Sequence, residues 1–263
     1  MSHTQDKSSA LGQGVVVFVY LAILSALEYF IAIAFEATAI LIVVAIVKAG
    51  LVMYYFMHIY KLNEEGDSDP HSHSYKTTTN RIGLWMFLLS DSFVFGGLLV
   101  MRSNLLGLHR PPLNQLLGLG VTSVLLLSSF FMNRGETAMA YGDTKTFMRN
   151  TVITFILGLG FLLGVVLVEW RLAGEEGLVA SFGNPAVGPV GGVFYMMTGM
   201  HAFHVLTGLI FLGIVWNNAR KGLYTAENHY PVEAAAVYWH FVDLVWIFFY
   251  PALYLIGKAL AIN

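Results

Sequence analysis

Seven runs of mostly apolar residues, each about as long as a membrane is thick, dominate this sequence of 263 residues. A hydrocarbon core of about 30 Å takes about 20 residues of α-helix to cross. An open strand edge cannot satisfy its backbone groups in lipid, so runs of this length are typical of helices. We therefore predict seven transmembrane helices, at residues 15–36, 38–60, 82–102, 113–132, 150–171, 190–216 and 233–258.

The composition supports a membrane protein. The chain is 57% hydrophobic and 11% charged, with a mean hydropathy of +0.67, which is more apolar surface than a soluble core needs. The absence of cysteine excludes disulfides and thiolate metal sites, and a net charge of −2 argues against a nucleic-acid partner. The polar first 14 residues lack the basic start and cleavage site of a signal peptide, so we expect them to be retained.

The basic residues predict an orientation. Cytoplasmic loops of membrane proteins carry an excess of Lys and Arg. With the N-terminus in the cytoplasm, the cytoplasmic side has nine: Lys7, Lys61, Lys76, Arg81, Arg134, Lys145, Arg149, Arg220 and Lys221. The opposite side has four: Arg102, Arg110, Arg171 and Lys258. We therefore expect a cytoplasmic N-terminus and a C-terminus on the periplasmic or extracellular side.

A polar, turn-rich stretch at residues 63–80 separates the first two spans from the last five. We predict an all-α integral membrane protein in three parts. A two-helix hairpin occupies residues 1–62, a polar cytoplasmic linker residues 63–80, and a five-helix bundle residues 81–263.

The first two spans each contain a charged residue, Glu28 and Lys48. A charged side chain at the centre of a membrane helix costs about 2.5–3.5 kcal/mol on insertion scales. A tight turn between antiparallel spans puts the two residues at similar depth, so we predict that they pair, within the chain or with a neighbouring subunit. The alternative is that Lys48 alone extends to the membrane surface.

Four further spans contain polar residues. Asp91 lies near the middle of the third span, as a protonatable or lipid-facing carboxyl or as a buried acid kept neutral by its neighbours. Glu169, beside Trp170 and Arg171, is typical of an interfacial anchor. His201 and His204 share a helix face, and we favour a hydrogen-bonded histidine pair over a metal or haem site. The only strong further donors at that depth are His240 and Asp243 of the last span.

The last five spans resemble subunit III of the haem-copper terminal oxidases. The matching segments are GLWMFLLSDSFVFGG (83–97), LGLGFLLGVVLVEW (157–170), FYMMTGMHAFHVLTG (194–208) and EAAAVYWHFVDLVWIFFY (233–250). The segments LEYF (27–30) and AIVKAGLVMYYFMHIYKL (45–62) resemble subunit IV of bacterial oxidases. The hairpin could equally occupy the place of the two helices that precede the bundle in full-length subunit III.

The resemblance implies an accessory, non-catalytic subunit of a bacterial plasma-membrane oxidase that reduces oxygen and pumps protons in aerobic respiration. It implies no haem, copper or other metal in this chain, since those centres belong to subunits I and II. It also implies packing against subunit I, alongside subunit II and other small subunits, structural phospholipids, support of proton uptake, and a place in a respiratory supercomplex.

Particular residues follow from the resemblance. Asp91 takes the place of a membrane-buried glutamate of the family. The family's polar positions in the last two spans, associated with lipid or proton uptake, fall on His201, His204, Glu233, His240 and Asp243. Arg220 and Trp85 are candidate ligands of a lipid headgroup.

Three other functions remain open from the sequence. A subunit III-like partner of a nitric oxide reductase would share the bundle, and the catalytic subunit that co-purifies would distinguish it. An autonomous transporter or channel would use the buried acids and histidines as its pathway. A haem protein in its own right would show Soret absorbance in the isolated subunit.

Overall fold

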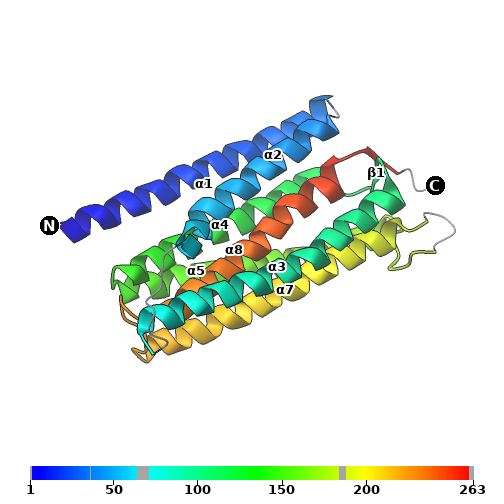
Figure 1. The fold of residues 1–263 in the computed structure, drawn as a ribbon. Helices are drawn as coiled ribbons and strands as arrows, with labels where there is room; N and C mark the ends of the chain where they lie inside the picture. The colour runs from blue at the N-terminus through cyan, green and yellow to red at the C-terminus, as the bar shows by residue number, and fades with distance from the viewer. Residues whose placement is uncertain (1, 36, 64–70, 184–187, 261–263) are drawn as a thin grey trace.

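The computed structural model describes residues 2–35, 37–63, 71–183 and 188–260 (Figure 1). Within these residues, seven helices are long and apolar enough to cross a membrane, which confirms the predicted all-helical fold. The chain passes up and down the bundle, so that the N-terminus and the C-terminus lie at opposite ends. We call these the N-terminal end and the C-terminal end of the bundle.

The long helices are α1 (Ser2–Phe35), α2 (Thr38–Leu51), α3 (His73–Leu106), α4 (Gln115–Ala140), α5 (Thr144–Leu163), α7 (Val190–Arg220) and α8 (Tyr230–Tyr250). Three π-helical turns, η1 (Val52–Phe56), η3 (Gly164–Glu169) and η4 (Pro251–Leu255), extend α2, α5 and α8. The short elements are the 3₁₀-helix η2 (Ile59–Asn63), helix α6 (Trp170–Glu175), and strands β1 (His109–Arg110) and β2 (Lys258–Ala259), which pair in parallel.

Helix α3 begins at His73, inside the segment that the sequence predicts to be a linker. The side chain of Ser72 caps it, since its hydroxyl oxygen accepts a hydrogen bond from the backbone N–H of Tyr75 at 3.1 Å. The polar residues up to Asn80 therefore form the first turns of a helix that is longer than its apolar part. Residues 64–70 of the expected linker lie outside the described residues.

The hairpin of α1 and α2 lies along one side of the other helices (Figure 1). Helix α1 packs against α4, and α2 packs against α8. The α1–α4 contact is close, because a Cβ atom on Gly14 would lie 2.7 Å from the side-chain oxygen of Asn133. Small residues permit this approach between membrane helices.

Helix α8 is the centre of the bundle. Its most hydrophobic stretch is 83% buried, against 28% for that of α1. It packs against α2, α3, α4 and α7. Trp239 of α8 lies against Gly208 of α7, where a Cβ atom would come within 2.9 Å of the indole ring. A mostly apolar and largely buried helix thus forms the core on which α2, α3, α4 and α7 pack.

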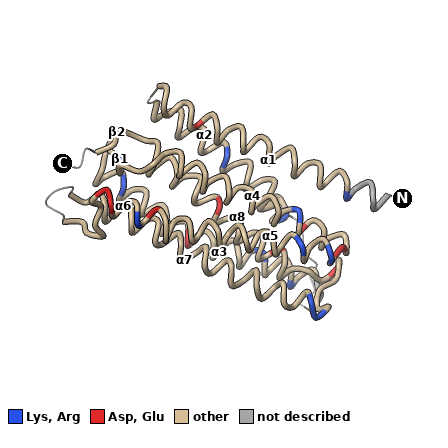
Figure 2. Tube along the Cα trace, turned by 180° about the vertical axis from the view of Figure 1, so that it is seen from behind, with Lys and Arg blue, Asp and Glu red and all other residues tan. Residues whose placement is uncertain are grey.

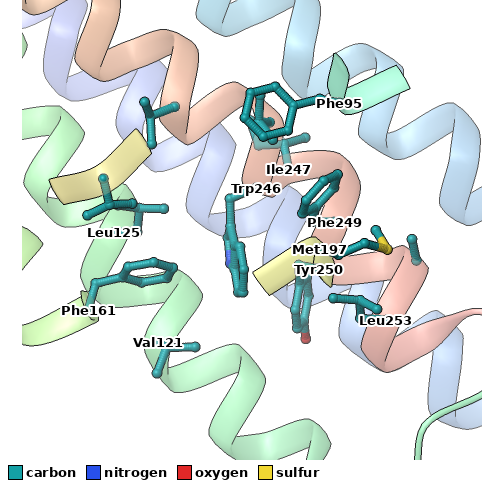
Figure 3. Close-up of a cluster of buried hydrophobic side chains, with 14 of the residues drawn as sticks. Phe95, Val121, Leu125, Phe161, Met197, Trp246, Ile247, Phe249, Tyr250 and Leu253 are labelled. Atoms are coloured by element: carbon teal, nitrogen blue, oxygen red, sulfur yellow. The ribbon is translucent and has the colours of Figure 1, made fainter. Parts of the chain in front are cut away.

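The core around α8 is aromatic. Trp246 points between α4 and α5, toward Leu125 and Phe161 (Figure 3). The rings of Trp246 and Phe161 meet edge to face, with centroids 4.9 Å apart and an interplanar angle of 87°. The indole N–H donates a hydrogen bond to the hydroxyl oxygen of Thr122 at 2.9 Å. The polar atom of this large side chain is thereby satisfied inside the membrane.

Arg102 holds the C-terminal end of the bundle together. Its guanidinium group donates hydrogen bonds to the carbonyl oxygens of Ala252, Gly107, His109 and Ile256 at 2.7–3.0 Å. These carbonyls belong to the end of α3, the strand after it, and the turn and residues that follow α8. A charged group buried at 4% exposure is thus satisfied by backbone acceptors alone.

Candidate functional site: a buried polar seam

One face of α8 carries polar side chains along its whole length. Glu233, His240, Asp243 and Tyr250 are spaced by seven, three and seven residues, which places them on one side of a helix. All four are buried. Polar residues of the neighbouring helices accompany them. We use the name polar seam for the set formed by Glu233, His240, Asp243 and Tyr250 of α8, Ser129 and Glu136 of α4, Glu28 of α1 and Lys48 of α2.

At the N-terminal end, the seam begins in a cluster of ion pairs. Arg81 of α3 donates to both carboxylate oxygens of Glu233, at 2.9 and 3.1 Å. The ammonium nitrogen of Lys61 lies 3.6 Å from Glu233 Oε1 and 4.0 Å from Glu136 Oε1. Two cations therefore compensate two buried carboxylates, and together they join α3, α4, α8 and the segment after α2.

His58 lies beside this cluster but adds no charge to it. Burial, reinforced by the nearby Lys61 ammonium, lowers the pKa of His58 to about 4. The imidazole is therefore neutral near pH 7, although its Nδ1 is 3.9 Å from Glu136 Oε1. The residue has a φ of 51°, in the left-handed region that non-glycine residues rarely adopt. His58 follows η1, at the point where the chain leaves the hairpin.

In the middle of the seam, Ser129 and His240 are hydrogen-bonded, with Oγ and Nδ1 2.6 Å apart. The His240 ring also packs against Phe56, with centroids 5.1 Å apart. Among the described residues, His240 Nε2 and Asp243 Oδ2 have no hydrogen-bond partner. The centre of α8 therefore presents an imidazole and a carboxyl with unused hydrogen-bonding capacity toward α4 and the hairpin.

Glu28 of α1 and Lys48 of α2 meet within the hairpin. The ammonium group of Lys48 donates a hydrogen bond to Glu28 Oε2, and both side chains are almost completely buried. Glu28 lies on the same face of α1 as Val17 and Leu21, which are also buried. The structure thus brings the two residues together within the chain, so that each compensates the buried charge of the other.

Asp91 and His204 form a separate pair between α3 and α7. His204 Nε2 lies 3.2 Å from Asp91 Oδ2, and the side chains are 11% and 20% exposed. His204 Nδ1 lies 2.8 Å from the carbonyl oxygen of Met200, to which it must donate. The two side chains therefore lie within ion-pair distance of each other in the wall of the bundle.

His201 does not join His204, so the hydrogen-bonded histidine pair expected from their spacing is wrong. Neither ring nitrogen of His201 has a hydrogen-bond partner among the described residues. Its ring lies against Trp246, with centroids 4.9 Å apart, and against Phe161, at 5.6 Å. Packing against these two aromatic rings sets the orientation of the His201 side chain. Within the described part of the chain, no group of three or more His, Cys, Asp or Glu could hold a metal ion.

The two candidate headgroup residues have different surroundings. Trp85 lines an apolar groove of about 510 Å³ between the end of α2, α3 and α8, with Met57 and Phe241. A second groove of about 480 Å³ lies between the same helices toward the C-terminal end, beside Arg102. The guanidinium of Arg220 instead lies 4.9 Å from the ring centroid of Trp216, on α7.

Sequence reasoning missed two buried carboxylates. Glu136 follows the predicted fourth span and resembles a surface residue in sequence, yet it is 4% exposed. Glu169 is 3% exposed, which overturns its interpretation as an interfacial anchor. Its Oε2 accepts a hydrogen bond from the Tyr254 hydroxyl at 2.6 Å. No spacing within either segment predicts these partners, because each partner comes from a distant part of the chain.

Fold and site together define a class: an all-helical, multi-pass membrane protein whose ionisable side chains are buried in pairs and clusters. Comparison with known proteins gives the family. The family model described as Cytochrome c oxidase subunit III matches residues 3–258. This chain therefore belongs to the cytochrome c oxidase subunit III family, as the four sequence segments predict.

Individual relatives agree with the family match. Cytochrome c oxidase subunit 3 of Thermostichus vulcanus is 36% identical over 184 residues, which are 67% of this chain and 87% of the relative. The Synechocystis protein of the same name is 33% identical over 196 residues, 72% of this chain and 80% of the relative. The rabbit protein, from Oryctolagus cuniculus, is 31% identical over 231 residues, 83% and 84% of the two chains. The chain is thus an accessory subunit of an oxidase complex.

Proposed function

We propose that this chain is subunit III of a bacterial plasma-membrane oxidase, packed against subunit I and accompanied by subunit II. In this assembly the partner subunits hold the haem and copper. The family match over residues 3–258 carries the proposal, because it spans the hairpin as well as the five-helix bundle. The match over the hairpin favours its standing in the place of the first two helices of subunit III. The likeness of the hairpin to subunit IV is a further proposal.

The distribution of charge supports a cytoplasmic N-terminus and a periplasmic C-terminus. Lys and Arg gather at the N-terminal end of the bundle (Figure 2). By the excess of basic residues on cytoplasmic surfaces, this end faces the cytoplasm. The cluster around Glu233 then lies at the cytoplasmic end, and the Arg102 network at the periplasmic end.

The proposed role of the subunit has two parts. The grooves between α2, α3 and α8 are almost wholly apolar and open toward the lipid-exposed side of α3, which suits the acyl chains of a structural phospholipid. The Asp91–His204 pair places a carboxyl and an imidazole 3.2 Å apart, both partly exposed, in the wall of the bundle, which suits a role in supporting proton uptake. Membership of a respiratory supercomplex belongs to the same proposal.

Co-purification tests the assignment. A tag on this chain should recover a haem-copper catalytic subunit, with haem absorbance and oxygen-reducing activity in the same fraction on a native gel. The alternative, a partner of a nitric oxide reductase, predicts that a reductase catalytic subunit migrates with it instead. Recovery of this chain with no catalytic subunit would contradict both.

A further inference from the structure

A small cavity opens at the C-terminal end of the bundle, apart from the grooves beside Trp85 and Arg102. It has a volume of about 160 Å³ and lies between the start of α4, the end of α6 and the turn after α8. Its lining includes Asn114, Glu169, Glu175, Glu176 and Tyr254. Three of these five side chains are carboxylates, so the cavity suits a cation.

The burial of Glu169 distinguishes this cavity from a patch of surface carboxylates. The residue is 3% exposed, and Tyr254, which fixes its Oε2 by a hydrogen bond of 2.6 Å, is 1% exposed. Glu169 Oε1 is buried and has no hydrogen-bond partner among the described residues. A buried oxygen left without a donor is costly, so a ligand that donates hydrogen bonds is favoured here.

The chemistry of the lining narrows the class of ligand. Among the described residues, no set of carboxylates or histidines is arranged to hold a metal ion. A volume of about 160 Å³ admits one ammonium group with a short carbon tail. A primary ammonium has three N–H donors, whereas a trimethylammonium group has none and would leave Glu169 Oε1 unsatisfied.

We propose that this cavity binds the ammonium group of an ethanolamine-type phospholipid headgroup. The surroundings fit a lipid, because Leu116, Leu167 and Leu172 expose 65%, 60% and 41% of their surface on the α4, η3 and α6 segments at this end. The side chain of Arg171 is 79% exposed and pairs with Glu175 at 3.2 Å, within the helix that forms the cavity rim. It can accompany the lipid phosphate while Glu169 receives the ammonium.

The test uses the intact oxidase complex in detergent, titrated with dihexanoyl phosphatidylethanolamine or dihexanoyl phosphatidylcholine and followed by native mass spectrometry. We expect one site that binds the ethanolamine lipid at least about tenfold more tightly than the choline lipid, the loss expected for one charge-assisted hydrogen bond. Glu169→Gln should abolish that preference. Equal binding of the two lipids by the wild type, or an unchanged preference in the variant, would overturn the proposal.

Two further variants separate binding from folding, with haem absorbance and subunit recovery as the check on assembly. Lys7→Met, whose side chain pairs with Asp143 at the opposite end of the bundle, should keep the preference for ethanolamine. Leu172→Trp fills the mouth of the cavity from an exposed position and should remove the preference even if Glu169→Gln fails to assemble. A carbodiimide cross-link from Glu176 to a lysine of another subunit would assign the cavity to a protein side chain, and would also overturn the lipid.

Discussion

Arg81 and Glu233 are 152 positions apart in the chain, yet Nε and Nη2 of Arg81 lie 2.9 and 3.1 Å from the two carboxylate oxygens of Glu233. This bidentate pair joins α3 to the central helix α8 at the N-terminal end of the bundle, where the chain also leaves the hairpin. Together with Lys61, which lies 3.6 Å from Glu233 Oε1, the pair links α3, α8 and the segment after α2.

Replacing Arg81 tests the bidentate geometry. We expect Arg81→Gln to destabilise the assembled subunit by about 3–5 kcal/mol, because Glu233 would remain buried with one fewer compensating cation. Arg81→Lys should recover only part of that loss, since a lysine cannot donate the same parallel pair of hydrogen bonds. Thermal denaturation of the purified complex measures both. A Lys variant as stable as the wild type would show that the charge is sufficient and the bidentate geometry is unimportant.

The Glu28–Lys48 pair offers a double-mutant cycle. Lys48→Met alone, or Glu28→Leu alone, should cost about 3–5 kcal/mol, because each leaves an uncompensated group inside the membrane. The double variant should be more stable than either single one, since two apolar side chains leave nothing unpaired. Retention of the subunit in the complex against rising detergent concentration provides the readout. Additive losses in the double variant would mean that the two groups act independently.

The surface pair between Lys7 and Asp143 is the matched contrast. Its ammonium–carboxylate distance is 2.8 Å, but the side chains are 25% and 33% exposed, so Lys7→Met should cost less than about 1 kcal/mol. The hydrogen bond from Lys7, with those from Thr146, lowers the pKa of Asp143 to about 2. A carboxyl whose pKa is lowered in the fold stabilises the folded state at pH values above its unfolded pKa, which is near 4. The contribution of Asp143 to stability should therefore persist at pH 5 and fade between about pH 4 and 2.

His58 should make the hairpin sensitive to acid. Its pKa is about 4 in the fold, against about 6.5 when unfolded, so the folded state binds fewer protons between these values. Stability should fall as pH drops from about 6.5 to 4, by up to about 3 kcal/mol. His58→Gln should flatten this part of the curve of melting temperature against pH. An identical curve for the variant would exclude His58 as the cause.

Asp91 and Asp243 should differ in their reaction with a membrane-soluble carbodiimide, which modifies the carboxyls that it can reach. The Asp91 side chain is 20% exposed, whereas Asp243 is 3% exposed at the centre of the bundle. We expect labelling at Asp91, its loss in Asp91→Asn, and no labelling at Asp243 in the intact complex. Peptide mapping by mass spectrometry would locate the adduct, and a modified Asp243 would contradict the burial of its side chain.

Much of the fold could be predicted from the sequence because bilayer thickness fixes the length of an apolar run. The number of spans and the depth match of Glu28 with Lys48 follow from that constraint and from a tight turn. Helix ends do not, since Ser72 extends α3 with polar residues that no hydropathy window includes. Hydropathy indicates which residues can contact lipid. An N-cap such as Ser72 stabilises the start of a helix through a backbone hydrogen bond and needs no apolar residues.

The direction of single side chains could not be predicted. His201 and His204 share a helix face, but one lies among aromatic rings and the other meets Asp91. Glu169 was hidden for a similar reason, because Tyr254 lies 85 positions away in the chain. Spacing along one helix gives the face of a residue, and the neighbouring helices decide its partner.

The order of the helices has a consequence for biosynthesis. The most enclosed segment, α8, follows the other six membrane-spanning helices in the chain, so those six leave the ribosome before the helix around which they pack. Until α8 is inserted, α2, α3, α4 and α7 lack the helix against which they pack, and Gly208 lacks its contact with Trp239. A truncated polypeptide ending before Tyr230 should therefore insert but remain open, and be recognised by membrane proteases as unfinished.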